Sequence, residues 1–243
     1  MNDVISLLKN HRSVRQFTTE PVSDETVREI IAAAGWSATS NFVQAYTVIR
    51  VRQQSTREAI AELAGGQSWV ETSPVFLVFC ADLKRSQSAC AYEKSEVVSG
   101  YTEQFIIATV DVSLAAQNAM VAAESLGLGG VFIGGIRNDP ATVSELLKLP
   151  EQVYPVFGMC LGHPAGEHEQ KPRLPVDVIL KEESYQESEA ELEHYNEICQ
   201  TYYQNRASAA RDETWTHQIA KMMSKPTRPH MRAFLEEKGF EFK

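Results

Sequence analysis

The sequence predicts one large soluble domain that combines helices and strands. Its 243 residues are enough to bury a substantial core. Hydrophobic residues make up 43% of the chain and charged residues 23%, which is the usual globular mix and argues against disorder, collagen and coiled coils. Short runs rich in β-branched and aromatic residues alternate with helical patterns. The length also allows an appendage, but it does not favour two unrelated domains.

The charge balance restricts the possible partners. A net charge of -9 and a sequence pI of 5.2 argue against a general affinity for nucleic acid or anionic membranes, because both normally require an extended basic surface. Asp3 stands where a signal peptide would carry lysine, and every long apolar stretch is interrupted by charges or amides. We therefore expect a cytoplasmic protein without a nucleic-acid or membrane partner.

The cysteines indicate neither disulfides nor a metal site. They are widely scattered, with no CxxC pair and no histidines at zinc-finger spacing. Reduced and mostly buried thiols are expected for such a pattern in the cytosol. The four positions are Cys80, Cys90, Cys160 and Cys199.

The first elements follow local signals. A short apolar-periodic run covers residues 4–8. Ser23, with acidic residues behind it, begins a helix that ends near Gly35. Residues 45–51 are rich in β-branched and aromatic side chains and predict a strand, which a helix at about 55–63 follows.

The middle of the chain contains the most apolar elements. Residues 74–81 predict a strand buried on both faces, whereas the polar residues 84–99 favour no particular structure. Residues 101–128 form the longest helical pattern, and small residues around its circumference indicate a central or dimer-interface helix. Asp111, Gln117 and Asn118 exclude a transmembrane span there.

The C-terminal half begins with a strand flanked by glycines at residues 129–135. Asp139 and Pro140 open a helix to about residue 147, and residues 154–162 predict another buried strand. Residues 182–197 carry seven acidic side chains and no lysine or arginine, which predicts a mostly solvated helix. The tail beyond it is basic, with further helical patterns.

Two cationic groups point to an anion. His11, Arg12, Ser13 and Arg15, called here the basic cluster, combine an imidazole, two guanidiniums and a hydroxyl, a set suited to phosphate oxygens. Cations that complement the end of a short helix are the alternative reading. In the second group, residues 171–175, prolines restrict the backbone around Lys171 and Arg173.

Two loops are ambiguous. The polar segment 37–41 is either a linker or part of a site. The glycines around residues 129–135 allow either a tight strand–turn or the close approach of a flat ligand. They do not form the dinucleotide fingerprint, because the GxGxxG spacing before a helix is absent.

Five motifs in order resemble the nitroreductase family of FMN-dependent oxidoreductases, in particular its NADPH-preferring, oxygen-insensitive group. They are HRSVRQF at the N-terminus, GGQ at 65–67, AAQNAMVAAESLGLGG, FIGGIRN and KPRLP. The resemblance implies a three-layer α+β fold with a mixed antiparallel sheet around a central helix. It also implies an obligate homodimer with one FMN per subunit, an FMN-binding core at residues 1–175 and a helical C-terminal extension of the same domain at 176–243.

The resemblance also implies the residues of the site. Lys171 and Arg15 would stabilise negative charge on the reduced flavin, and Thr39 and Ser40 would reach the flavin of the partner subunit. Arg206 and Arg211, separated by the small residues 207–210, would bind the NADPH 2′-phosphate. The expected FMN residues are His11, Arg12, Ser13, Arg15, Thr39, Ser40, Gln67, Phe132, Ile133, Gly134, Gly135, Lys171 and Arg173.

The implied activity is transfer of a hydride from NADPH to FMN and then to a flat acceptor, a nitroaromatic, a quinone or free flavin, by a ping-pong cycle. A dedicated flavin reductase and a non-catalytic flavin carrier or sensor are the alternatives. For Arg206 and Arg211, the alternative is pairing with carboxylates such as Asp212 and Glu213. Nucleic-acid binding by the basic tail is disfavoured by the acidic helix before it.

Overall fold

The computed structural model describes residues 2–207 and 209–243, and it consists of two compact units. Unit 1 contains the chain up to His168 together with His230–Lys243, and unit 2 is Glu169–Pro229. Ser208, one of the small residues expected between Arg206 and Arg211, lies outside the described residues. The division into residues 1–175 and 176–243 stays a prediction. Each unit is described by itself below.

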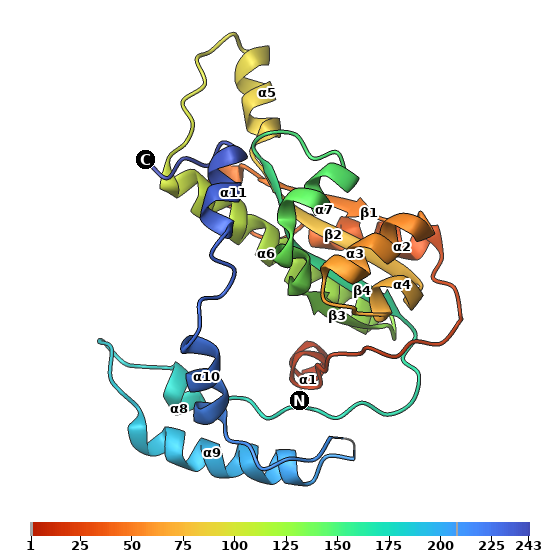
Figure 1. Ribbon diagram of the computed structural model, residues 1–243, viewed down its shortest axis with the longest axis vertical. Helices are drawn as coiled ribbons and strands as arrows, with labels where there is room; N and C mark the ends of the chain where they lie inside the picture. The colour runs from red at the N-terminus through yellow and green to blue at the C-terminus, as the bar shows by residue number, and fades with distance from the viewer. Residues whose placement is uncertain (1, 208) are drawn as a thin grey trace. The chain divides into compact units, whose positions relative to one another are not determined.

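Unit 1 is built on an antiparallel sheet of four strands in the order β1-β2-β4-β3 (Figure 1). The strands are β1 (Tyr46–Arg50), β2 (Val75–Asp82), β3 (Gly129–Ile133) and β4 (Val153–Gly162). All four were predicted within a residue or two. In the described pairings every neighbour is antiparallel, which refines the expected mixed sheet.

The central strand β2 supplies both faces of the core. All eight of its residues are buried, as the unbroken apolar run predicts. Because side chains alternate along a strand, Leu77 and Phe79 belong to one hydrophobic cluster, whereas Phe76 and Val78 belong to another. The sheet is therefore covered on both sides, which gives the expected three layers.

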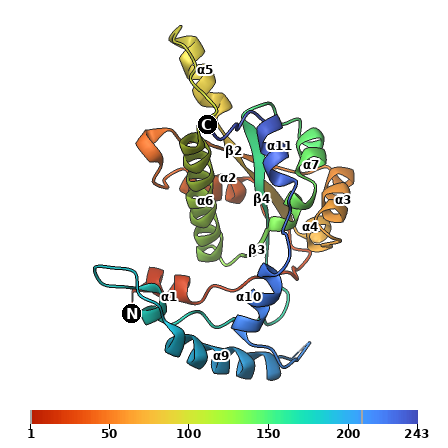
Figure 2. The same ribbon diagram turned by 60° about the vertical axis from the view of Figure 1, so that its left-hand side comes forward.

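Helices form the two outer layers, seen from the side in Figure 2. On one face, α6 (Thr102–Ser125) packs against the sheet with α2 (Asp24–Ala34) beside it. The other face carries α3 (Gln54–Leu63), α4 (Trp69–Thr72) and α7 (Pro140–Leu146). Between β3 and α7 lies the 3₁₀ helix η2 (Gly134–Asn138).

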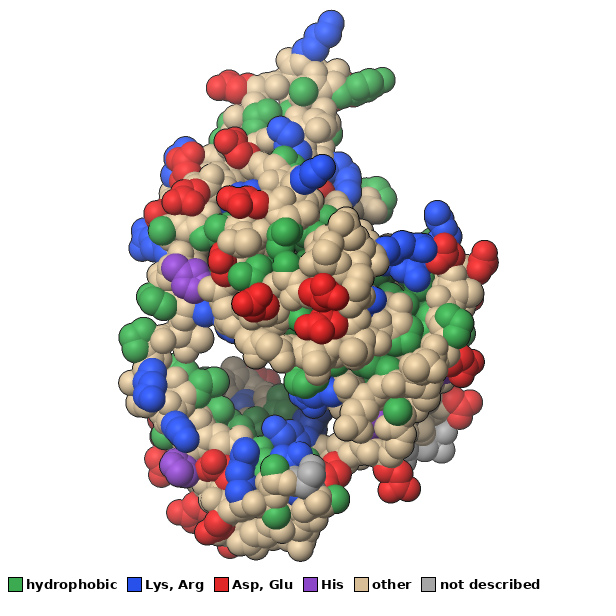
Figure 3. Space-filling model, turned by 45° about the vertical axis from the view of Figure 1, so that its right-hand side comes forward, with side chains coloured by type: hydrophobic (Ala, Val, Ile, Leu, Met, Phe, Trp, Pro, Cys, Tyr) green, Lys and Arg blue, Asp and Glu red, His purple; other side chains and the backbone are tan. Residues whose placement is uncertain are grey.

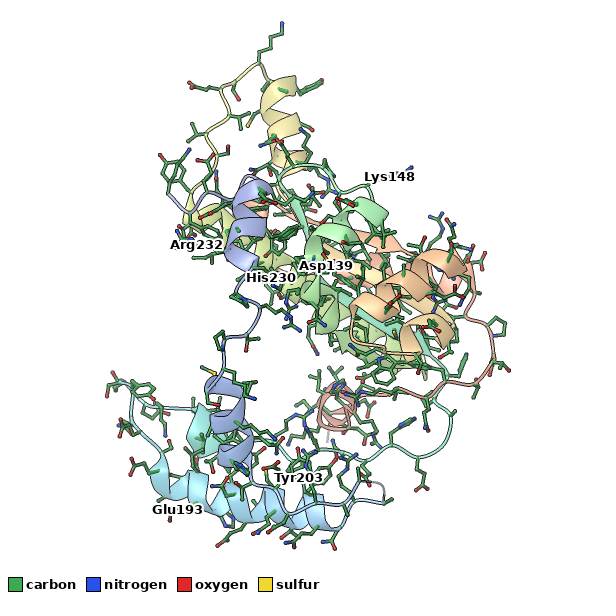
Figure 4. The ribbon with its side chains drawn as sticks, viewed as in Figure 1. Asp139, Lys148, Glu193, Tyr203, His230 and Arg232 are labelled. Carbon is green, nitrogen blue, oxygen red and sulfur yellow. The ribbon has the colours of Figure 1, made fainter. Side chains whose placement is uncertain are left out.

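Capping residues begin these helices where the sequence predicts. The Ser23 hydroxyl accepts the Thr26 N–H at 3.0 Å at the start of α2, and Asp139, labelled in Figure 4, accepts the Thr142 N–H at 3.0 Å at the start of α7. In α1 (Asp3–Lys9) the Asn2 side chain has the same role toward Val4. The short apolar run at the N-terminus is thus a capped helix.

The polar segment that favoured no structure contains a helix, α5 (Lys84–Tyr92). It has no buried residue and extends away from the sheet in both ribbon views (Figures 1 and 2). Its apolar side chains are few, so the hydrophobic periodicity that identifies helices is weak there.

The C-terminal residues complete the first unit. Helix α11 (Met231–Glu237) buries Phe234 and Leu235 in the cluster that contains α6. Beyond it, the Phe240 ring lies 5.2 Å from that of Tyr154 on β4, and the Lys243 N–H donates to Gly100 at 2.9 Å.

Helix α6 is long and apolar enough to meet the length and composition criterion for a membrane span. Its Asp111 is fully buried, however, and its other inward side chains, such as Ala116 and Met120, belong to the core cluster of the sheet. It is the core helix of unit 1, as predicted.

Unit 2 consists of α8 (Val176–Ile179), α9 (Glu189–Gln204) and α10 (Trp215–Met223). The predicted helix at 182–197 is wrong in its bounds: it begins at Glu189 and continues to Gln204. The reason is the apolar stripe Tyr195, Cys199 and Tyr203, which is buried and holds the later turns, whereas residues 182–188 bury no side chain and their one aromatic residue, Tyr185, is exposed.

The cysteines agree with the sequence-based expectation. All four thiols are free, and Cys80, Cys160 and Cys199 are buried. Burial raises the pKa of Cys80 and of Cys160 to about 12, so both stay protonated. On the face drawn in Figure 3, acidic and basic side chains are intermixed with apolar ones.

Candidate functional site

The basic cluster begins an extended segment along the outer edge of the sheet. Ser13 and Gly130 form a parallel bridge, and the Val14 N–H donates to Gly130 O at 2.9 Å. Val14 is buried, and a Cβ on Gly129 would come within 2.5 Å of its Cγ2. Because neighbours in an extended chain point to opposite sides, Ser13 and Arg15 are left exposed beside β3.

The other two members of the cluster have polar partners in unit 1. The His11 Nδ1 lies 2.6 Å from Oε1 of Glu124. Glu124 is in the last turn of α6, and its side chain is 12% exposed. Arg12 donates from Nε to Asn10 O at 3.2 Å and from Nη1 to His168 O at 3.4 Å. His11 and Arg12 are therefore oriented by hydrogen bonds, and one of the Arg12 bonds goes to the carbonyl of Asn10, the C-cap residue of α1.

A cavity of about 500 Å³ lies beside these residues. Arg12 and Glu124 line it, and the glycines at 127, 129 and 166 contribute no side chain to its wall. His168 also lines it, and its Nε2 is buried without a hydrogen-bond partner among the described residues. Room and an unsatisfied polar atom are properties of a ligand site.

The turn that carries Gln67 meets the end of β3. Gly65 and Gly66 have φ of 88° and 72°, a conformation that favours glycine, so α3 ends there as predicted. The Gln67 Nε2 then donates to Ala64 O at 2.7 Å. A Cβ on Gly135 would lie 2.5 Å from that same Nε2, so the two motifs are in direct contact.

The basic cluster reaches the same turn. The Arg15 guanidinium lies 5.8 Å from the centre of the Trp69 ring, two residues after Gln67, at a cation–π distance. The Trp69 Nε1 is buried and has no hydrogen-bond partner in the described part of the chain. Three motifs far apart in the sequence thus converge at the edge of β3.

Two expected FMN residues point away from this edge. Ile133 is fully buried in the core under α3 and α7. The Phe132 ring lies 5.2 Å from that of Phe157, edge to face, on the opposite side of the sheet. Their assignment stays a prediction, and for Ile133 it would require backbone atoms, as for Gly134 and Gly135.

Thr39 and Ser40 lie in another part of unit 1, in the loop before β1. The Ser40 N–H donates to Asp111 Oδ1 on α6 at 2.9 Å. Thr39 is extended, with φ -136° and ψ 153°. Their expected contact with a partner's flavin stays a prediction.

In unit 2, two expected binding cations flank one aromatic ring. The Lys171 Nζ lies 5.6 Å and the Arg211 Cζ 4.4 Å from the centre of the Tyr203 ring on α9 (Figure 4). Burial alone would raise the pKa of Tyr203, but hydrogen bonds with Lys171 and Gln218 outweigh it and lower the pKa. Arg173, the other cation of this segment, is exposed and donates to Lys171 O at 2.8 Å.

The cations assigned to the NADPH 2′-phosphate differ in their contacts. The Arg206 Nε lies 3.0 Å from Glu169 Oε2, and the other oxygen of Glu169 accepts the Ala207 N–H at 2.8 Å. The Ala207 and Arg206 bonds lower the pKa of Glu169. The Arg211 Nε lies 3.9 Å from Glu213 Oε2. The suggested carboxylate partner is thus seen for Arg211, whereas Glu169 was not foreseen for Arg206.

Sequence reasoning missed Glu124, Trp69 and Glu169 as neighbours of the site. For Glu124 a signal existed, because an acidic side chain inside a long apolar helix needs a partner. The contacts of Trp69 and Glu169 depend on tertiary folding, which no local pattern encodes. The described residues contain no group of three or more His, Cys, Asp or Glu that could hold a metal.

Comparison with known proteins agrees with this architecture. The chain is 45% identical over 242 residues to a Cr(VI) reductase of a Pseudomonas species, covering 99% of this chain and 100% of that protein. It is 44% identical over 241 residues to an oxygen-insensitive NADPH nitroreductase of Salmonella typhimurium, covering 99% of both. The solved structure of an NADPH:FMN oxidoreductase from Vibrio harveyi, complexed with NAD⁺, superimposes with a TM-score of 0.91 at 39% identity and full coverage of both chains.

Two family models together cover most of the sequence. Residues 8–163 match the nitroreductase family, and residues 171–243 match the nitroreductase family C-terminal domain. The first match contains the basic cluster, the Gln67 turn and β3, and the second contains the cations of unit 2. The chain therefore belongs to the nitroreductase family.

Proposed function

We propose that this protein is an FMN-dependent oxidoreductase that takes electrons from NADPH and passes them to nitroaromatics, quinones or free flavin. The observation that carries the proposal is the convergence of the basic cluster, the Gln67 turn and Gly134–Gly135 at the edge of β3. Relatives with similarity along the whole chain are an NADPH nitroreductase and an NADPH:FMN oxidoreductase, which supports both the cofactor and the electron donor.

The donor set of unit 1 fits FMN. A phosphate needs cations and hydroxyls, which the exposed Ser13 and the half-buried His11 and Arg12 supply. A flat apolar ring needs backbone without protruding side chains, which Gly134 and Gly135 provide. The Trp69 Nε1 offers a further buried donor without a partner among the described residues. The assignments of Lys171 and Arg173 to the flavin stay predictions.

When bound, FMN supplies the two-electron chemistry, so the protein needs no nucleophile of its own. The protein contributes binding and electrostatics. Arg15 would present a fixed positive charge that stabilises added negative charge more than the oxidised state, while the Glu124 carboxylate keeps the His11 imidazole in one orientation.

The acceptor class follows from the chemistry of an open flavin face. Relatives named for nitroaromatics, flavin and Cr(VI) indicate broad acceptance. A dedicated flavin reductase is the second candidate, favoured by the oxidoreductase from Vibrio harveyi named for FMN itself. Cytoplasmic location and the absence of nucleic-acid and membrane partners stay predictions.

The proposed activity predicts a yellow protein whose flavin absorbance is lost on anaerobic addition of NADPH and returns with a nitroaromatic or quinone. Arg15→Ala should raise the Kd for FMN roughly tenfold to a hundredfold, because a charge-assisted bond contributes about 1.5 to 3 kcal/mol. Arg232→Ala, which changes a guanidinium that is 78% exposed, is the control. Flavin that stays oxidised with NADPH would support the carrier alternative instead.

We also propose a homodimer. Helix α6 presents Ile106, Val110 and Leu114 to solvent at 46%, 48% and 42% exposure, and these residues follow one another at helical spacing along one stripe. An apolar stripe of this kind is expected to be covered. Analytical ultracentrifugation at micromolar concentration should show a dimer, and Val110→Glu should weaken it. A monomer that retains FMN would contradict this proposal.

A further inference from the structure

Asp111 is a fully buried carboxylate in the middle of α6. Burying a carboxylate is unfavourable unless hydrogen bonds replace its water. Asp111 has two such bonds: Oδ1 accepts the Ser40 N–H at 2.9 Å, and Oδ2 accepts the Ala45 N–H at 3.1 Å. One side chain therefore holds the backbone at two points of the connection between α2 and β1: at Ser40, in its middle, and at Ala45, the residue before β1.

The loop that Asp111 holds is conformationally strained. Asn41, Phe42 and Gln44 have φ of 45°, 61° and 54°, a region that non-glycine residues adopt rarely and that clusters at functional sites. Phe42 is 82% exposed, so the strain does not serve to bury its ring. A simple connection between a helix and a strand would not require this shape.

We propose that Asp111 is a positioning residue, which holds loop 39–45 in the shape that places Thr39 and Ser40 against the FMN of a second copy of this chain. The proposal rests on the proposed function. We expect the loop to contact a second copy of the chain because α6 connects the loop with the proposed dimer interface. Asp111 is buried on the inner side of α6, and Val110, the preceding residue, belongs to the exposed apolar stripe. The helix that would contact the partner thus also holds the loop.

Both anchors are backbone N–H groups, so the loop's shape does not depend on the side chains of Ser40 and Ala45. A second contact acts on the same segment, because the Arg85 Nη1 donates to the carbonyls of Gln44 and Tyr46 at 3.2 and 2.9 Å. The side chains of Thr39 and Ser40 remain available for a ligand while the backbone N–H of Ser40 is held.

The first test is Asp111→Asn. Asparagine has the same shape, but its NH₂ group would face one of the two N–H donors, so one bond is lost. The homodimer of this variant should bind FMN at least tenfold more weakly than wild type in a fluorescence titration. Ser23→Ala, which removes the cap of α2 in the same unit but does not touch the loop, should leave FMN affinity within about twofold.

A purely structural role is separated from positioning by mixed dimers. We would co-express an Asp111→Asn subunit with an Arg15→Ala subunit, each carrying a different tag, and isolate the heterodimer. Its Asp111→Asn subunit has an intact basic cluster and receives an intact loop from the other subunit. One FMN per dimer should therefore bind with near wild-type affinity, although both homodimers bind weakly.

The opposite result would overturn the proposal. If the loop served the flavin of its own subunit, or if Asp111 only stabilised its own fold, both sites of the heterodimer would be damaged and tight binding would not return. If Asp111→Asn is insoluble, Ser40→Pro removes the N–H that Asp111 Oδ1 accepts and leaves α6 unchanged, and Thr39 already has the extended conformation that precedes proline. Ser40→Ala, which loses the same hydroxyl but keeps the N–H, is its matched control and should bind FMN more tightly than Ser40→Pro. The same recovery in mixed dimers is expected with Ser40→Pro. Wild type without FMN would instead refute the proposed function.

Discussion

Gly135→Ala should abolish FMN retention during purification and destabilise the protein. The new Cβ would lie 2.5 Å from Gln67 Nε2 and still closer to the Ala64 carbonyl oxygen. Because the carbonyl is backbone, it cannot move aside as the end of a side chain can. Overpacking of this kind lowers the free energy of unfolding by about 1 to 3 kcal/mol. It would also displace the Gln67 turn, so that the side-chain amide of Gln67 moves away from the proposed flavin site.

The neighbouring glycine is the stability control for this variant. A Cβ on Gly134 would come no closer than 3.3 Å, to the end of the Arg137 side chain, so Gly134→Ala should remain close to wild type in urea denaturation. FMN titration of Gly135→Ala should give a Kd raised at least tenfold. Wild-type FMN affinity in this variant would mean that the contact between Gln67 and Gly135 lies outside the flavin site.

Arg206→Ala should raise the KM for NADPH roughly tenfold to a hundredfold while NADH turnover stays nearly unchanged. Only NADPH carries a 2′-phosphate, and a charge-assisted bond to it contributes about 1.5 to 3 kcal/mol. The effect should fall on KM rather than kcat, because this phosphate is bound alike in ground and transition states. Steady-state kinetics with both dinucleotides measure the difference.

Two further variants make this test specific. Arg211→Ala should act in the same direction, since it removes the other proposed phosphate cation. Asp212→Asn removes a charge in the same segment, where its Oδ1 accepts bonds from Gln200 and Gln204, and it should preserve the preference for NADPH. Equal losses with NADPH and NADH in Arg206→Ala would assign Arg206 to folding or to the flavin site.

Local patterns predict the parts of the fold that depend on local physics. Seven of the eight buried residues of β2 form an apolar run, Ser23 and Asp139 are capping residues, and Gly65 and Gly66 have positive φ at a helix end. Each of these features needs only its neighbours in the sequence. The basic cluster likewise follows from the donors that a phosphate requires.

Other features depend on residues that meet only after folding. The start of α9 at Glu189 follows from where Tyr195 and Cys199 find partners, not from the acidic run before them. The Asp111 bonds join residues 71 and 66 positions apart. Phe132 belongs to a motif expected at the flavin, yet its ring packs on Phe157, because alternation along β3 sends adjacent side chains to opposite faces.

The packing of residues 230–243 into unit 1 has a consequence for the order of folding. These residues are synthesised after unit 2, yet Phe234, Leu235 and Phe240 complete a hydrophobic cluster otherwise built from residues before 169. During translation, part of the apolar surface of the sheet and α6 therefore stays uncovered until residues 169–229, and residues 230–243 after them, have been made. Contacts across such a long separation slow folding, since the loop must close before they form. A nascent chain that lacks residues 230–243 therefore exposes apolar surface of this cluster, the condition under which partly folded chains aggregate and chaperones act.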